Sequence, residues 1–480
     1  MDRNRGSRSA AGRRRLSGVR RRGRRLATAA FSSATALAVL ALSAVVLSVW
    51  SCSSFDPVGG KRRPPVAGWP GDAPSDRPVT PLYESEPEIR VRIREPIETV
   101  RVESASGLLA ASPAGRPSRV TGSAVVTAPN GAVRMTLPDG GFYEFPAGAT
   151  VTITPADGPQ VPATVRIDGT EYPGQISIRP RSDSGSGLLE VIATMPIEVY
   201  LPGVLSKELF ANWPLAAYEA QAVCARTYAL FQRSQDRAAG RAYDVESTQA
   251  DQVFGGATAN RTALEAVKST RGMLLTYEGA IFKTYYSSTC GGRSASAADV
   301  WPTTRGFEYN LAAPIQGAPR EHYCQAARLY RWETIRTTEE LAKRLAAWGR
   351  HSGHAVRSVG TVATVAVEKL NQTGRPSRYT VIDDRGRSFS LSGEELRVAC
   401  NFAAQGFPPI TPPTRVNSND LEFTPIAGSG VPTFQVRGRG FGHGVGMCQW
   451  CLKGLADRGV PWENQVLLFY PGARVVRAYR

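Results

Sequence analysis

Hydrophobic and polar residues alternate through much of residues 88–195, and this period of two predicts short β-strands. The alternating runs are 89–93, 99–102, 142–145, 150–153 and 176–178. Turn-forming sequences lie between them, at Pro129-Asn130-Gly131 and Asp139-Gly140-Gly141. We expect an all-β region that packs on the rest of the chain and contributes no catalytic residue of its own.

The pattern becomes helical at residues 199–231, where Trp213 and Pro214 separate two predicted helices. Pro202 and Pro214 are each expected in the first turn of a helix, because that turn does not need the amide hydrogen that proline lacks. The second helix carries on one face Ala217, Gln221, Cys224, Ala225 and Tyr228. A glutamine and a phenol are unusual on a face that only fills a core.

Glu208 stands at the end of the first of these helices, among the apolar residues Leu205, Leu209 and Phe210. Apolar surroundings raise the pKa of a carboxyl group. A raised pKa suits a group that gives and takes a proton near neutral pH. The alternative is a solvated glutamate on a short helix, which is the more common situation for such a spacing.

Mixed elements are predicted farther along the chain. Expected helices are 261–269, 338–349 and one beginning at 449, and expected strands include 362–368 and 378–383. We interpret residues 333–418 as a substructure inserted into a catalytic part that spans 196–480. Together with the β-rich part at 88–195, this predicts an α+β protein.

Positive charge is concentrated at the start of the chain, whose formal net charge is +17. Residues 1–25 form an arginine-rich leader, and residues 26–50 contain no charged residue and are long enough to cross a bilayer as a helix. Arginine on one side predicts a cytoplasmic N-terminus and an exported remainder, by a signal anchor or a signal peptide. Cleavage of the leader and lipidation of Cys52 both stay open. Residues 51–87, rich in proline and glycine, are expected to be a tether.

All seven cysteines lie beyond residues 26–50, which fits an oxidising compartment in which cysteines pair. One interpretation joins Cys290 and Cys324 in a disulfide. The alternative is a structural metal site of Cys290, His322 and Cys324. Cys448 and Cys451 form a C-x-x-C motif, which alone is a weak indication of zinc or redox chemistry. No cofactor is expected.

Several short motifs occur in a fixed order along about residues 88–480. They include Tyr200-Leu201, Gly203-Val204, Glu208-Leu209, Trp213-Pro214, Ala220-Gln221-Ala222-Val223, Ala225-Arg226-Thr227-Tyr228, Gln252-Val253-Phe254-Gly255-Gly256, Thr270-Arg271-Gly272, Ser287-Ser288-Thr289-Cys290-Gly291-Gly292, Asp299-Val300-Trp301, residues 440–449 and Tyr470-Pro471-Gly472. This series resembles the SpoIID/LytB family, named after stage II sporulation protein D and a modifier of a cell-wall amidase.

The chain departs from the family pattern at several places. Cys451 and Ala216 stand where a glycine and a second glutamate are usual, so Glu208 is the acid that matches. Some lytic members carry zinc ligands in the segment equivalent to residues 243–251, which has neither cysteine nor histidine here.

The resemblance implies action on peptidoglycan outside the cytoplasmic membrane. The family's lytic members cleave the bond between N-acetylmuramic acid and N-acetylglucosamine without water and leave a 1,6-anhydro end. In that role Glu208 is the single general acid and base, and His443 orients substrate, bonds Glu208 or is purely structural. The residues expected to bind substrate are Gln221, Arg226, Tyr228, Gln252, Ser288, His443 and Gln449.

A second hypothesis is a non-catalytic glycan binder that stimulates an N-acetylmuramoyl-L-alanine amidase. The expected partners are therefore glycan strands, the cell membrane through residues 26–50, and a cell-wall amidase. Nucleic acid is not expected, because no basic patch with interleaved aromatic residues lies outside the leader. A serine or cysteine hydrolase is disfavoured by the lack of a G-x-S-x-G motif.

Overall fold

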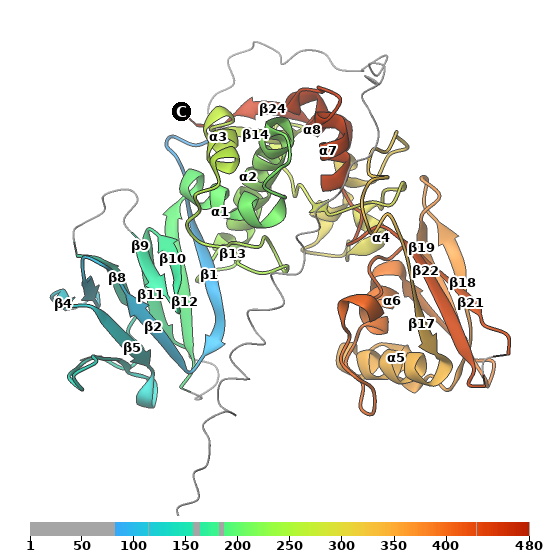
Figure 1. Ribbon diagram of the computed structural model, residues 1–480, viewed down its shortest axis with the longest axis horizontal. Helices are drawn as coiled ribbons and strands as arrows, with labels where there is room; N and C mark the ends of the chain where they lie inside the picture. Colours follow the sequence, from blue (N-terminus) through green and yellow to red (C-terminus); the bar gives the residue numbers. More distant parts are fainter. Residues whose placement is uncertain (1–81, 114, 157–163, 182–186, 429, 480) are drawn as a thin grey trace, which may run out of the picture. The chain divides into compact units, whose positions relative to one another are not determined.

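The computed structural model describes residues 82–113, 115–156, 164–181, 187–428 and 430–479 (Figure 1). The expected leader, the apolar segment at 26–50 and most of the tether lie outside these residues. Among the helices in the described ranges, none combines the length and the apolar character needed to cross a bilayer.

Two β-sheets occupy the region where alternation predicted strands. The first runs, in spatial order, β13 (Val245–Glu246), β1 (Glu88–Ile97), β12 (Leu189–Pro196), β11 (Gln175–Pro180), β8 (Val151–Pro155), β3 (Leu108–Ala111) and β4 (Ser118–Val120). The second runs β10 (Thr170–Pro173), β9 (Thr164–Ile167), β2 (Thr99–Glu103), β5 (Ser123–Thr127), β6 (Val133–Thr136) and β7 (Phe142–Phe145). Ile89, Val91 and Ile93 alternate with polar residues along β1 and are buried. The predicted strands are confirmed here.

Two helices follow the first sheet, α1 (Ile197–Glu208) and α2 (Leu215–Ala238) (Figure 1). Pro214 is the N-cap of α2, close to its expected place. Pro202, by contrast, lies inside α1, so the expectation that it opens the helix is wrong. Burial of Tyr200 and Leu201 on the core outweighs the one backbone hydrogen bond that a proline in mid-helix gives up.

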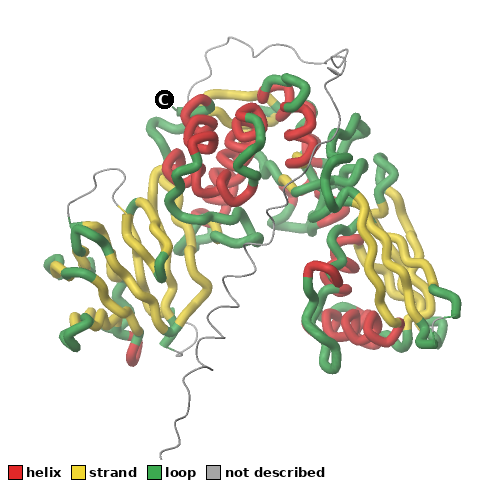
Figure 2. The backbone as a smooth tube through the Cα atoms, viewed as in Figure 1, coloured by secondary structure: helices red, strands yellow, loops and turns green. Residues whose placement is uncertain are grey.

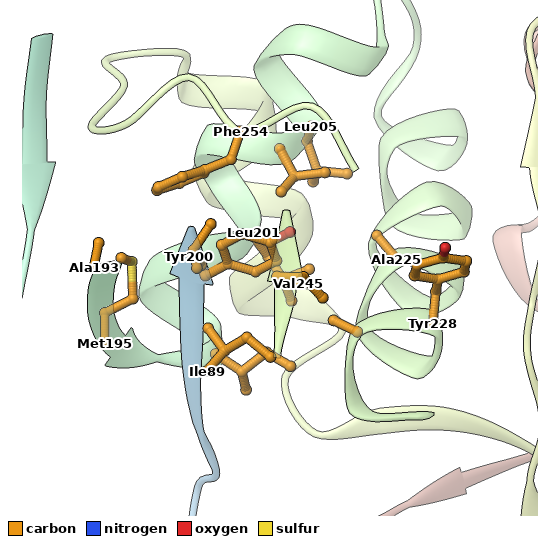
Figure 3. Packing of buried hydrophobic residues seen from close by; sticks show 14 of the residues in the cluster. Ile89, Ala193, Met195, Tyr200, Leu201, Leu205, Ala225, Tyr228, Val245 and Phe254 are labelled. Atoms are coloured by element: carbon orange, nitrogen blue, oxygen red, sulfur yellow. The ribbon is translucent and has the colours of Figure 1, made fainter. Parts of the chain in front are cut away.

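Helix α1 packs tightly against the segment 252–256, as Figure 3 shows for Leu201, Leu205 and Phe254. A Cβ atom added at Gly203 would lie 2.3 Å from the Gly256 carbonyl oxygen and 2.5 Å from the Phe254 ring. Only glycine therefore permits this approach. The contact fixes the segment beside the C-terminal end of α1.

The remaining elements of this first core come from distant parts of the chain. They are α3 (Arg261–Ser269), the sheet of β15 (Ala280–Ile281), β14 (Met273–Tyr277) and β24 (Arg474–Arg477), the parallel pair β16 (Tyr286–Ser287) and β23 (Met447–Cys448), and the helices α7 (Gln449–Ala456) and α8 (Trp462–Phe469). The helix expected at 261–269 is confirmed with the same bounds.

A second hydrophobic core extends from Trp332 to Val436. It contains β17 (Arg331–Thr337), α5 (Thr338–Ser352), β18 (Val362–Leu370), β19 (Pro376–Asp383), β20 (Ser388–Ser392), α6 (Gly393–Cys400), β21 (Leu421–Pro425) and β22 (Thr433–Arg439). Helix α5 follows the first strand, and α6 separates β18, β19 and β20 from β21 and β22; Figure 2 shows the helices in red beside the strands in yellow. Because β22 pairs with β17 along its whole length, this unit is wider than the expected insert at 333–418. The α+β class is confirmed, with several separate sheets.

Candidate functional site

Glu208 is the last residue of α1 and is half-buried. One carboxylate oxygen, Oε1, accepts a hydrogen bond from the Val253 N–H at 3.2 Å. The other, Oε2, accepts one from Nε2 of Gln449 at 3.0 Å. Both oxygens are thus held by groups from distant parts of the chain, which fixes the direction in which the carboxyl group points.

Burial raises the pKa of Glu208 above its ordinary value of 4.5, and the hydrogen bonds from Gln449 and Val253 oppose the rise. The direction is the one that its apolar neighbours in sequence predicted. A raised pKa leaves a larger protonated fraction near neutral pH than an exposed glutamate has, and a protonated carboxyl group can donate a proton.

Gln449 reaches Glu208 because two short segments pair in parallel. Tyr286 lies opposite Met447, and Ser287 lies opposite Cys448, which is the N-cap of α7. A Cβ atom added at Gly446 would lie 2.1 Å from the Tyr285 carbonyl oxygen, so the glycine-rich loop needs its glycine there.

The first turn of α7 is also anchored on the segment that contains β16. The Trp450 N–H donates to the Ser288 carbonyl oxygen at 3.1 Å. Ser288 and Gln449, both expected to bind substrate, therefore lie near each other and near Glu208.

Three aromatic rings close in sequence to Glu208 or Gln449 pack together. Phe210 and Trp213 follow α1, and Trp450 follows Gln449, with ring centroids 5.3 to 6.0 Å apart. Trp213 is buried, whereas Phe210 is 40% exposed. The cluster thus presents an apolar edge to solvent next to the candidate acid.

Arg226 is completely buried and binds Glu198 through two hydrogen bonds, Nε to Oε1 at 3.1 Å and Nη2 to Oε2 at 2.7 Å. Oε1 of Glu198 also accepts from the Gly272 N–H at 3.0 Å and the Tyr479 hydroxyl at 2.6 Å. This network joins α1, α2 and the chain's last residues. The Arg226 guanidinium therefore has a structural partner.

Gln252 and Tyr228, also expected to bind substrate, have internal partners too. The Gln252 amide accepts from the Tyr200 hydroxyl and donates to the Ala225 carbonyl oxygen, each at 3.2 Å. The Tyr228 hydroxyl donates to Asp251 at 3.0 Å. Their role in substrate binding stays a prediction, because these internal hydrogen bonds account for both polar side chains without a ligand.

Gln221 is fully buried on α2. Neither its side-chain oxygen nor its nitrogen has a hydrogen-bond partner within the described residues. A buried amide without partners is costly, so its presence calls for an explanation. Hydrogen bonds within the described structure therefore do not account for a polar side chain at this position.

His443 is half-buried in the glycine-rich loop. Its Nδ1 accepts a hydrogen bond from the Val445 N–H at 3.0 Å, and its ring lies 4.8 Å from that of Trp301. Burial lowers the pKa of His443 to about 4, although the charge of Glu394 acts in the opposite direction. The imidazole is therefore neutral at neutral pH. Among the described residues, Glu208 accepts hydrogen bonds from Val253 and Gln449, and none joins it to His443.

Sequence reasoning missed Asp251 and Lys283. Burial raises the pKa of Asp251, and the hydrogen bond from the Glu246 N–H and the charge of Lys283 oppose this. Burial lowers the pKa of Lys283, and Asp251 opposes that change. The ammonium group also lies 5.1 Å from the Tyr228 ring. Asp251 directly precedes the Gln252 motif, and that position could have marked it as a candidate site residue. Nothing in the sequence relates it to Lys283.

The cysteines correct one expectation. The Cys290 and Cys324 sulfur atoms are 3.7 Å apart and both thiols are free, so the expected disulfide is absent from the described structure. A disulfide bond is about 2.0 Å long. Nδ1 of His322 lies 3.2 Å from the Cys290 sulfur. Cys448 and Cys451, which form a separate motif in the sequence, belong to the same buried cluster.

Comparisons with known protein families give two matches. Residues 186–277 match the SpoIID family, described as Stage II sporulation protein. Residues 309–446 match a domain of unknown function (DUF8618), which overlaps the second hydrophobic core. The first match contains α1, α2 and Glu208.

Distant relatives are found among characterised and uncharacterised bacterial proteins. An uncharacterised protein of Brachyspira hyodysenteriae is 27% identical over 311 residues, 65% of this chain and 73% of that protein. Stage II sporulation protein D of Bacillus subtilis is 25% identical over 301 residues, 60% of this chain and 76% of that protein. The amidase enhancer of Bacillus subtilis is 24% identical over 290 residues, 57% of this chain but only 39% of the enhancer.

Proposed function

We propose, on the premise that residues 186–277 form a SpoIID family domain, that this chain cleaves the glycan strands of peptidoglycan as a lytic transglycosylase. The observation that carries the proposal is Glu208. Its carboxyl group is half-buried, is held at both oxygens and has a pKa raised by burial. These are the properties of a group that donates and then accepts a proton.

The proposed reaction needs this one carboxyl group. Protonated Glu208 donates its proton to the glycosidic oxygen as the bond from that oxygen to C1 of N-acetylmuramic acid breaks. The resulting carboxylate accepts the proton of the 6-hydroxyl group of the same sugar, whose oxygen forms the new bond to C1. The products are a 1,6-anhydro end and a free 4-hydroxyl group on N-acetylglucosamine. No water is consumed, unlike in two-carboxylate hydrolysis.

Gln449 and Val253 orient the carboxyl group in this scheme. Their N–H donors stabilise the carboxylate that forms when the proton leaves. The exposed edge of Phe210 offers an apolar surface for the face of a sugar ring. Neutral His443 and Ser288 lie in the loops beside Gln449, and we assign them to substrate positioning.

The test is cleavage of purified glycan strands by the full chain and by Glu208→Gln. The substitution keeps the size of the side chain and one acceptor oxygen, replaces the other oxygen by an NH2 group, and removes the proton that can be transferred. We expect anhydro ends, detected by mass spectrometry, from the wild type and none from the variant. Glu265→Gln, which changes an exposed glutamate on α3, should cleave normally. Equal product from Glu208→Gln would refute the assignment.

The similarity to the amidase enhancer supports a second candidate, a glycan-binding protein that stimulates an N-acetylmuramoyl-L-alanine amidase. The same purified strands distinguish the two. Shortening of the strands without any amidase supports the enzyme. Co-sedimentation with sacculi without shortening, together with faster amidase action, supports the stimulator.

We also propose that the chain acts outside the cytoplasmic membrane, held there by residues 26–50. The support is the charge pattern of the N-terminal residues. Protease treatment of intact spheroplasts should digest the part beyond residue 50, and protection from protease would contradict this location.

A further inference from the structure

Four cysteines that are far apart in sequence form one buried cluster. Cys290, Cys324, Cys448 and Cys451 come from three segments, and their sulfur atoms all lie within 4.8 Å of one another. Each of the four is almost completely buried. All four side chains belong to the first hydrophobic core.

The distances fit a tetrahedral metal site. The Cys290 sulfur lies 3.7 Å from that of Cys324 and 4.0 Å from that of Cys451. Four sulfurs bound to zinc at about 2.3 Å would be about 3.8 Å apart at the corners of a tetrahedron. Two disulfide bonds would instead require two sulfur pairs at about 2.0 Å. The observed spacing is that of ligands around a shared centre.

Backbone groups are arranged to stabilise negative sulfur atoms. The Cys290 N–H points at the Cys448 sulfur at 3.3 Å, and the Tyr323 N–H points at the Cys451 sulfur at 3.4 Å. His322 places Nδ1 3.2 Å from the Cys290 sulfur. Outer donors of this kind orient thiolate ligands and reduce the charge that accumulates at a four-sulfur site.

We propose that these four cysteines bind one zinc ion as a closed structural site. Binding displaces one proton from each thiol, and the four thiolates fill all four positions of a tetrahedral ion. No position is left for water or substrate, so the ion does no chemistry on glycan. His322 then serves as a hydrogen-bond donor to the Cys290 sulfur, which differs from the three-ligand set suggested by the sequence.

The position of the site indicates what the ion holds together. Cys448 directly precedes Gln449, and Cys290 follows the segment whose Ser288 carbonyl accepts from the Trp450 N–H. Zinc would join this segment, the residues around Cys324 and the first turn of α7. The ion therefore fixes the helix start that carries the Gln449 side chain to Glu208.

Zinc content of the purified full chain tests the proposal directly. We expect one zinc ion per chain by elemental analysis and its release when a mercurial reagent titrates the thiols. Cys451→Ser should reduce bound zinc to background. Cys400→Ser, which removes a buried cysteine of the second core, and His322→Ala should both retain it.

A second readout covers the case in which Cys451→Ser folds poorly. Wild-type protein treated with a strong chelator should show faster hydrogen exchange at residues 448–456 than the zinc-bound protein, and added zinc should restore protection. Three results would each overturn the proposal. They are wild-type protein that contains no zinc, a protein mass that reveals disulfides among the four cysteines, and zinc that Cys451→Ser retains. None of these measurements depends on glycan cleavage, so this inference and the proposed function can fail separately.

Discussion

Replacing Arg226 by methionine tests whether this residue supports the fold or binds substrate. The Arg226 side chain is 0% exposed and that of Glu198 is 7% exposed. The substitution removes the positive charge, the two hydrogen bonds to Glu198 and those to Thr270 and two backbone carbonyl oxygens. The Glu198 carboxylate then keeps only the Gly272 N–H and the Tyr479 hydroxyl as donors. It therefore leaves a buried charge without its counterion.

Breaking a buried ion pair on one side costs about 3–5 kcal/mol. This is a large part of the roughly 5–15 kcal/mol that holds a typical protein folded. We expect Arg226→Met to lower the free energy of unfolding by about that amount. The double variant Arg226→Met with Glu198→Gln should lose less, because no unpaired charge remains.

The assay is urea unfolding followed by tryptophan fluorescence, with the slope against denaturant compared between variants so that the same transition is measured. Arg233→Met on the same helix is the control, since Arg233 is half-buried and bonds only the Glu88 carbonyl oxygen among its described hydrogen bonds. Wild-type stability of Arg226→Met together with lost glycan cleavage would refute the structural role and restore the role that the family resemblance implied.

Four further predictions concern the site and its supports. Burial raises the folded-state pKa of Glu208, so the stability that its protonated form contributes is present in acid and is lost as pH rises through that pKa. Glu208→Gln should therefore gain stability relative to the wild type over this rise in pH. Wild-type glycan cleavage should fall over the same range, because less of the carboxyl group is protonated. Gly203→Ala should cost about 1–3 kcal/mol in urea unfolding, because its Cβ atom would overlap Gly256; unchanged stability would contradict the close packing of α1. Gln221→Met should raise the free energy of unfolding by about 1–3 kcal/mol, since the amide has no described partner; a loss of stability would show that it has one. Phe210→Ala should leave stability nearly unchanged and weaken co-sedimentation with sacculi several-fold, because the ring is 40% exposed; unchanged binding would remove the ring from the glycan surface.

The errors of sequence reasoning have physical causes. Proline is normally excluded from a helix interior, so Pro202 pointed to a helix start, but burial of its neighbours on the core lets α1 begin upstream. The proline-rich link at 408–418 suggested the end of an insert. Because β17 pairs with β22, the second core instead includes residues both before and after this link.

Local patterns in the sequence determined the strands of residues 88–195, the helices around Trp213 and Pro214, and the apolar surroundings that raise the pKa of Glu208. Such features depend on residues a few positions apart, and the period of a strand or a helix reveals them.

Tertiary structure alone decided which groups meet at the carboxyl group and at the cysteines. Val253 and Gln449 lie 45 and 241 positions from Glu208, and Cys451 lies 161 positions from Cys290. No local pattern relates residues so far apart. Their meeting depends on the packing of segments such as the one that Gly203 admits, and packing is a property of the whole folded chain.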